Sequence, residues 1–387
     1  MIGPFENSQK RQLRSVGGPP TTLACVVGMC LALGPSGLES QTRPPLSSEW
    51  DQAAAADYLD GRQAWWRTWP IAARDHDTSC VSCHTALPYA LARPALRAAL
   101  SERGPTVPEA DLLADVAKRV ALWNEVDPYY PDQTVGLPKT SESRGTEAIL
   151  NALILSNRDA REGHLTSETQ EAFEHLWKLQ FTRGERAGGW AWLYFDLAPW
   201  ESLGADYFGA ALAAVAVGIA PGQYATSAEI QDRVALLKAY LQEDWEDRPP
   251  LDRVMLLWAS AELRDLLTPD QQRSIIHDLA SLQNGDGGWS LTSLGRWEPR
   301  DGLAPDLASD GYATGLIAFA LQKAGVSRAQ ESVSGALQWL VRNQDPNSGL
   351  WPSSSLNRER DPASDRGRMM ADAATAFAVL ALTQAGP

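Results

Sequence analysis

Three residues set close together are the best candidates for chemistry in this chain. Cys80, Cys83 and His84 form a C-x-x-C-H spacing, and an apolar, helix-like stretch follows from Thr85 to Leu96. Two thiols and an imidazole at this spacing can anchor a haem, hold a metal ion or form a thiol pair. Haem attachment is the leading interpretation.

The C-x-x-C-H string resembles the haem-attachment motif of c-type cytochromes. The resemblance implies one covalent haem c, with Cys80 and Cys83 as its two thioether anchors. It also implies that His84 is the proximal ligand of the iron.

Two other interpretations of the same residues remain open. A thiol pair at a helix start has the lowered thiolate pKa of a disulfide oxidoreductase, but thioredoxin-like proteins place that pair in a βαβ unit, and no such pattern surrounds Cys80. A structural zinc needs four ligands, whereas this loop offers three, with His76 or Asp77 as the only additions nearby.

Repeated segments predict the elements that position this motif. Stretches such as "LASLQNGDGGWSL" followed by "SDGYATGLIAFALQKAG" combine a helix ending in Gln, a Gly-rich turn closing on Trp, and an Ala/Leu-rich helix. Helices that are apolar nearly all round are expected to begin near residues 84, 146, 206, 252, 310 and 372, separated by amphipathic helices. Six such pairs predict an all-α fold, an (α/α)6 toroid, with an open helical solenoid as the alternative.

The Gln-to-Gly-x-Trp turns resemble the QW repeats of squalene-hopene cyclases, within the terpenoid cyclase and protein prenyltransferase toroids. We expect each Trp ring to cover the end of an outer helix while its N–H finds a partner. The three matching sets are Gln180 with Gly188, Gly189 and Trp190; Gln283 with Gly287, Gly288 and Trp289; and Gln344 with Gly349, Leu350 and Trp351.

The catalytic residues of those families are missing. No D-x-D-D string is present, and the nearest acids, Asp306 and Asp310, are weak catalytic candidates. The zinc ligands of prenyltransferases have no counterpart, because the later repeats contain no cysteine. Acids that open inner helices, namely Asp206, Asp252, Asp310 and Asp372, are interpreted as helix N-terminal acids.

A closed ring would place the sixth repeat beside the first. Met369 and Met370 would then begin the inner helix next to His84, which makes them candidates for the sixth iron ligand, with His76 a weaker candidate. If none of them binds, the iron has an open site. The nearby arginines, Arg358, Arg360, Arg366 and Arg368, can pair with haem propionates or with the flanking Glu359, Asp361 and Asp365.

The N-terminal segment is typical of an export signal. Lys10, Arg11 and Arg14 precede an apolar run from Leu23 to Leu33 that is too short to span a bilayer. We therefore expect residues 1–40 to be an export signal and flexible N-terminus, with residues 41–387 forming one toroidal domain in the periplasm. A lipid anchor on Cys25 or Cys30 is an alternative to a free mature chain.

The net charge of −14 argues against a nucleic-acid partner. The C-x-x-C-H motif and the export signal together indicate an exported haem-c protein. It would exchange electrons with a redox partner protein or act on a small hydrophobic substrate. The alternative is a non-redox toroid, terpenoid cyclase-like or isoprenoid-binding, in which Cys80 and Cys83 form a disulfide.

Overall fold

The computed structural model describes residues 49–297 and 306–384, and these described residues form one compact unit. The predicted export signal, residues 1–40, lies outside the described residues. Within the described part, thirteen α-helices and one small antiparallel sheet are present. None of these helices has the length and apolar character needed to cross a membrane.

The elements follow one another along the chain as short helices joined by turns and loops. They are α1 (Gln52–Thr68), β1 (Ala73–Arg74), β2 (Thr78–Ser79), α2 (Ala86–Ala99), α3 (Val107–Ala121), α4 (Asp132–Val135), α5 (Lys139–Glu162), α6 (Ser167–Leu179), α7 (Asp206–Ile219), the 3-10 turns η1 (Tyr224–Thr226) and η2 (Ala228–Ile230), α8 (Gln231–Gln242), α9 (Pro250–Glu262), α10 (Pro269–Ser281), η3 (Leu291–Leu294), α11 (Gly311–Lys323), α12 (Glu331–Asn343) and α13 (Met369–Thr383).

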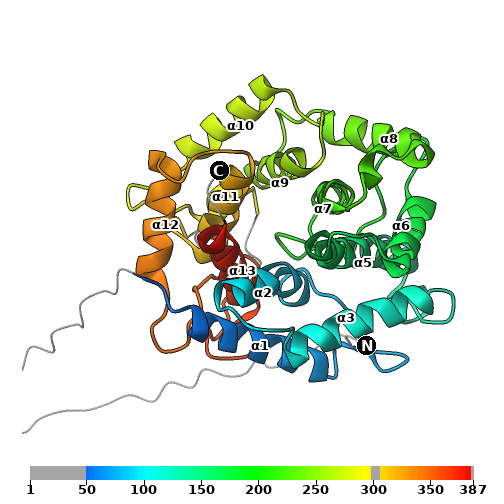
Figure 1. Ribbon diagram of the computed structural model, residues 1–387, viewed down its shortest axis with the longest axis horizontal. Coiled ribbons are helices and arrows are strands. Elements are labelled where there is room, and N and C mark those ends of the chain that lie inside the picture. The colour runs from blue at the N-terminus through cyan, green and yellow to red at the C-terminus, as the bar shows by residue number, and fades with distance from the viewer. Residues whose placement is uncertain (1–48, 298–305, 385–387) are drawn as a thin grey trace, which may run out of the picture. The chain divides into compact units, whose positions relative to one another are not determined.

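Alternate helices form an inner set whose members pack side by side. Helices α2, α5, α7, α9, α11 and α13 contact one another in that order, and α13 contacts α2 again. Helices α1, α3, α6, α8, α10 and α12 lie outside them, each against an inner helix (Figure 1). An inner helix is covered on several sides, which explains why α7 and α13 are apolar nearly all round. The mostly helical prediction is confirmed, and the arrangement is consistent with an α/α toroid.

The three Gln-to-Trp turns adopt one shared geometry. In the first, the Trp190 Nε1–H donates to the carbonyl of Leu176 in the last turn of α6 at 2.8 Å. Gln180 Nε2 donates to the carbonyls of Gly188, in the turn, and Arg233, in the next outer helix, both at 3.1 Å. Trp289 and Trp351 make the same bond to the ends of α10 and α12. These residues therefore join successive outer helices, as their interpretation as structural elements predicts.

The third turn connects the last repeat to the first. Gln344 Nε2 donates to the carbonyl of Asp51, the N-cap of α1, at 2.9 Å, and the Asp51 amide donates back to Gln344 Oε1 at 2.7 Å. Gly349, in the same turn, has a φ of +74°. A Cβ on Gly349 would come within 2.4 Å of the backbone carbon of Ala54 in α1. The turn therefore needs glycine for its conformation and for the close approach of α1.

Gly349→Ala is expected to destabilise the protein more than Gly163→Ala does. Gly163 has nearly the same φ, +76°, but nothing lies within 4 Å of a Cβ added there, so that variant measures backbone strain alone. The clash with Ala54 should lower the free energy of unfolding of Gly349→Ala by a further 1 to 3 kcal/mol, roughly. Urea unfolding of both variants measures the difference, and equal losses would show that α1 does not press on this turn.

One predicted helix start is wrong. The inner helix expected near Thr146 begins at Lys139, directly after Pro138, and so gains two polar turns. Proline ends the preceding segment because it lacks an amide hydrogen and disfavours a helical conformation in the residue before it. The apolar pattern used for the prediction begins only where the helix becomes buried, at Ser143 to Ala148.

Candidate functional site

The loop that carries the two cysteines is fixed at both ends. The Cys80 amide donates to the carbonyl of Ala72 across the β1–β2 hairpin at 2.9 Å, and the Cys80 carbonyl accepts from Trp66 Nε1 at 2.7 Å. At the other end, Ser82 Oγ accepts from the amides of Thr85 and Ala86 at 3.2 and 3.1 Å. Ser82 thus satisfies the free amides at the start of α2 and places His84 at the helix entrance.

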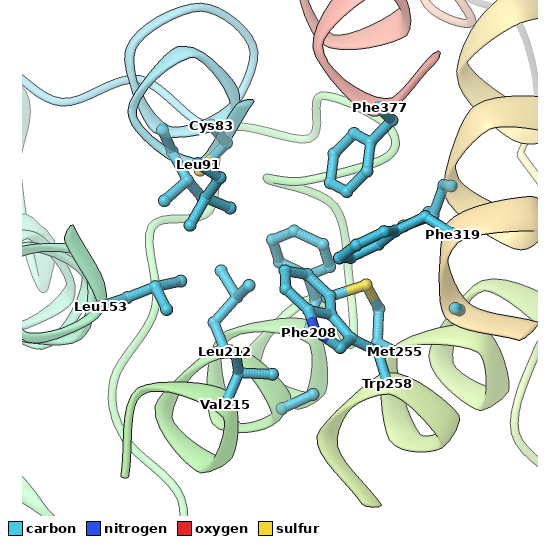
Figure 2. Close-up of a cluster of buried hydrophobic side chains, with 14 of the residues drawn as sticks. Cys83, Leu91, Leu153, Phe208, Leu212, Val215, Met255, Trp258, Phe319 and Phe377 are labelled. Atoms are coloured by element: carbon cyan, nitrogen blue, oxygen red, sulfur yellow. The ribbon is translucent and has the colours of Figure 1, made fainter. Parts of the chain in front are cut away.

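Both cysteines are buried free thiols. Figure 2 shows Cys83 at the edge of an apolar cluster to which every inner helix contributes. Burial is the largest influence on both thiols and raises the pKa of Cys80 and Cys83 above the usual value. A disulfide oxidoreductase needs a thiolate of lowered pKa, so these surroundings do not favour thiol exchange.

His84 is packed between aromatic rings. Its imidazole meets the Trp66 ring edge to face at 4.9 Å between centroids, and the Trp200 ring lies at 6.3 Å. Removal from water, followed by the positive charges of Arg62 and Arg360, lowers the pKa of His84 to about 3. The imidazole is therefore neutral at physiological pH, the state in which histidine binds a metal.

The Nδ1 atom of His84 is the start of a buried hydrogen-bonded network. It lies 2.8 Å from Thr85 Oγ1, which donates to Asp372 Oδ2 at 2.6 Å. Asp372 also accepts from Tyr58 Oη at 2.7 Å and from Arg62 Nε and Nη2 at 2.7 and 3.0 Å. The interpretation of Asp372 as a plain helix-terminal acid is therefore incomplete, because its carboxylate joins α13 to α1 and to the start of α2.

The described side chains suit a haem better than they suit zinc. Cys80 and Cys83 are uncombined thiols, which is the form that adds to haem vinyl groups, and His84 is a neutral imidazole. Across residues 49–297 and 306–384, no three His, Cys, Asp or Glu side chains are arranged to hold a metal ion. A tetrahedral zinc site thus has no ligand set in this part of the chain.

His76 lies apart from this network. It occupies the turn of the β1–β2 hairpin with a φ of +55°, and its side chain is 42% exposed. Its Nδ1 lies 3.1 Å from Asp75, and its carbonyl accepts from Lys118 of α3 at 2.9 Å. His76 is thus held toward the outer helix α3, and its role as a sixth ligand stays a prediction.

Met369 and Met370 begin α13, the helix that also carries Asp372. Met370 is buried, and Met369 is partly exposed one helical turn before Asp372. The expected proximity of this helix start to His84 is confirmed by the bond from Thr85 to Asp372. Asp372 is linked to the Nδ1 atom of His84 through Thr85, and the roles of Met369 and Met370 as sixth ligands stay predictions.

If Met369 or Met370 is the sixth ligand, we expect its alanine variant to change the visible spectrum of the haem-loaded protein, because the iron loses a thioether ligand. The spectra of both variants, oxidised and reduced, measure this. A changed spectrum in one variant alone would identify that methionine as the sixth ligand.

The two acids considered for catalysis, Asp306 and Asp310, differ in burial and in hydrogen-bond partners. Asp310 caps α11, accepting from the amides of Tyr312 and Ala313 at 2.8 and 3.1 Å, and burial raises its pKa to about 6. Asp306 is exposed and accepts from the amide of Ala308 at 2.9 Å. Asp310 is accounted for by the start of its helix.

The arginine-rich loop before α13 lies against α1 and near His84. Arg366 lies over the Trp69 ring at 5.4 Å, and Arg360 is close enough to lower the pKa of His84. Asp365, considered as a partner for these arginines, instead pairs with Arg62 of α1 at 2.9 Å. The loop is thus tied to the same helix that supports Asp372.

Several residues of this site carry no signal in the sequence. Trp66, Arg62 and Tyr58 belong to α1, and Thr85 follows the motif directly. Tyr58, Arg62 and Trp66 recur at every fourth residue, which places them on one face of a helix. That spacing could have indicated a shared role. What they face is shown only by the hydrogen bonds of Tyr58 and Arg62 to Asp372 and by the ring contact of Trp66 with His84.

Comparisons with known proteins give little further guidance. No family model matches the chain, and no curated protein matches it. Among solved structures, the chain is similar to a glycosidase with 11% sequence identity and a TM-score of 0.48, over 85% of this chain and 96% of that one.

Proposed function

We propose that this chain is an exported (α/α)6 toroid that carries one covalent haem c at the start of its first inner helix and takes part in redox chemistry. The observation that supports this most is the C-x-x-C-H loop at the entrance to α2, where two free thiols precede a neutral imidazole. Cys80 and Cys83 would hold the haem and His84 would bind its iron.

The haem would supply one-electron redox chemistry at its iron, and the chain would supply the surroundings. Trp66 and Trp200 restrict the orientation of His84 and remove it from water. The Trp200 Nε1–H is itself held by Tyr312 Oη at 2.9 Å, which ties the loop before α7 to α11. These contacts would keep the proximal ligand rigid.

The apolar interior supports a hydrophobic small molecule as substrate. Leu91, Leu153, Phe208, Phe319 and Phe377 come from five different inner helices and converge on one cluster with Cys83 at its edge (Figure 2). A group bound at Cys83 would therefore border apolar side chains. Electron transfer to a partner protein is the other redox role compatible with this proposal.

The second candidate function is isoprenoid binding without redox chemistry. The same apolar cluster favours it, together with the Gln-to-Trp turns that resemble those of cyclase toroids. In that case Cys80 and Cys83 would form a disulfide.

The visible spectrum of the protein tests the choice. The full chain is expressed in an exporting host with haem-maturation machinery, and spectra are recorded oxidised and reduced, with a denaturing gel stained for covalent haem. Sharp reduced bands and a stained protein band are expected. A colourless, unstained protein would contradict the haem proposal, and binding of isoprenoid alcohols would then be measured.

A further inference from the structure

The partner of His84 Nδ1 is unusual because it is a hydroxyl that is itself bonded to a buried carboxylate. Resting on the proposed function, we propose that Thr85 and Asp372 form a hydrogen-bonded relay that orients His84 as an iron ligand and raises the electron density on its Nε2 atom. Thr85 and Asp372 are positioning residues in this proposal, since they act through His84.

The direction of each hydrogen bond follows from the donors around Asp372. Burial raises the pKa of Asp372, but its carboxylate receives two bonds from the always-charged Arg62 guanidinium, and this bidentate pairing favours the ionised form. An ionised carboxylate only accepts, so the single hydroxyl proton of Thr85 must point to Asp372 Oδ2. The Thr85 oxygen is then left to accept, and the proton of this bond must belong to His84 Nδ1.

This assignment leaves the lone pair of the imidazole on Nε2. A histidine in that tautomer can bind iron through Nε2 without first losing a proton. Metal-binding histidines generally donate their other N–H to a carbonyl, carboxylate or water, and this bond raises the basicity of the ligand. Here the 2.6 Å bond from Thr85 to a charged carboxylate polarises the hydroxyl that receives the Nδ1 proton.

Burial increases the effect of the relay. Thr85 is 2% exposed, Asp372 1% and Arg62 4%, so water does not compete for these bonds. Greater electron density on Nε2 stabilises the oxidised iron relative to the reduced iron and lowers the midpoint potential. The cation of Arg62 opposes part of this, because it shares the charge of Asp372.

A purely structural role for Thr85 would be to hold α2 against α13. Thr85→Val keeps the shape of the side chain and removes the hydroxyl, so it weakens that tie and breaks the relay together. Thr85→Ser keeps the hydroxyl. Thr375→Val is the matched control, because Thr375 is a fully buried threonine of α13 whose hydroxyl bonds to Ala371 and Trp351 instead.

The midpoint potential of the haem-loaded full-length protein separates the two roles. Thr85→Val is expected to shift the reduction equilibrium toward the reduced form by about tenfold, which for a one-electron couple is about 59 mV upward. Thr85→Ser should restore the wild-type potential, and Thr375→Val should lose stability without moving it. Equal potentials in all four proteins, or equal shifts in both valine variants, would overturn the relay.

A second measurement needs neither haem nor a stable variant. In the full chain produced without haem maturation and labelled with 15N histidine, the His84 signals should show a protonated Nδ1 and an unprotonated Nε2. The opposite tautomer would overturn the relay even if the protein carries haem. Absence of covalent haem from the matured wild-type protein is seen on the stained gel, and it would contradict the proposed function and the relay with it.

Discussion

A chain in which Cys80 and Cys83 are both alanine is expected to carry no covalent haem after expression with haem-maturation machinery in an exporting host. The two thiols are the only cysteines among the described residues, and Cys25 and Cys30 lie in the predicted export signal. The stained band of the denaturing gel should disappear. In the single variants one thioether remains possible, so a weaker stained band and a shifted spectrum are expected.

Variants of two histidines test whether the visible spectrum of the haem depends on the C-x-x-C-H motif. His84→Ala should remove the proximal ligand and the visible bands of a native haem c. His164→Ala is the matched control, because the His164 side chain is 65% exposed just after the end of α5 and lies outside the network around His84. A stained band that persists in the double cysteine variant would contradict attachment at this motif.

The helical character of the chain and the motif could be predicted from the sequence because both depend on local patterns. An apolar helix that opens on Asp206 begins at that residue in the structure. The structural role of each repeat Gln could also be predicted, because all three precede a Gly-containing turn that ends in Trp. In the structure each Gln side chain donates to the carbonyl of a glycine in its turn. The start of α5 was not predicted because its first two turns are polar. The run of apolar residues used for the prediction shows where the helix is buried, not where it begins.

The support of His84 could not be predicted from the sequence. Arg62 and Asp372 are separated by 310 positions, and their bond exists only because α13 packs beside α1 and α2. An acid in the first turn of a helix has a sufficient local explanation, so nothing in the sequence indicates a distant partner. The link from Asp372 through Thr85 to the Nδ1 atom of His84 likewise depends on how α13 packs against the start of α2.

Asp372→Ala is expected to cause the largest loss of stability among single changes near the site. Its carboxylate accepts four hydrogen bonds, and Arg62 is buried against it with 5% of the side chain exposed. Removing it leaves Arg62, Tyr58 and Thr85 without their main acceptor in a dry interior. Breaking a buried ion pair in this way costs about 3 to 5 kcal/mol.

Asp365→Ala is the control that isolates burial as the cause. Asp365 also pairs with Arg62, at 2.9 Å, but its side chain is 55% exposed, so its loss should cost less than about 1 kcal/mol. Urea unfolding of both variants gives the loss in free energy of unfolding when Arg62 loses its buried partner, Asp372, or its exposed partner, Asp365. A large loss for Asp372→Ala alone would show that α13 is held to α1 through this carboxylate, because Arg62 of α1 and Thr85 of α2 meet there. Equal small losses would mean that the Gln344–Asp51 turn and apolar packing join the last helices to the first without it.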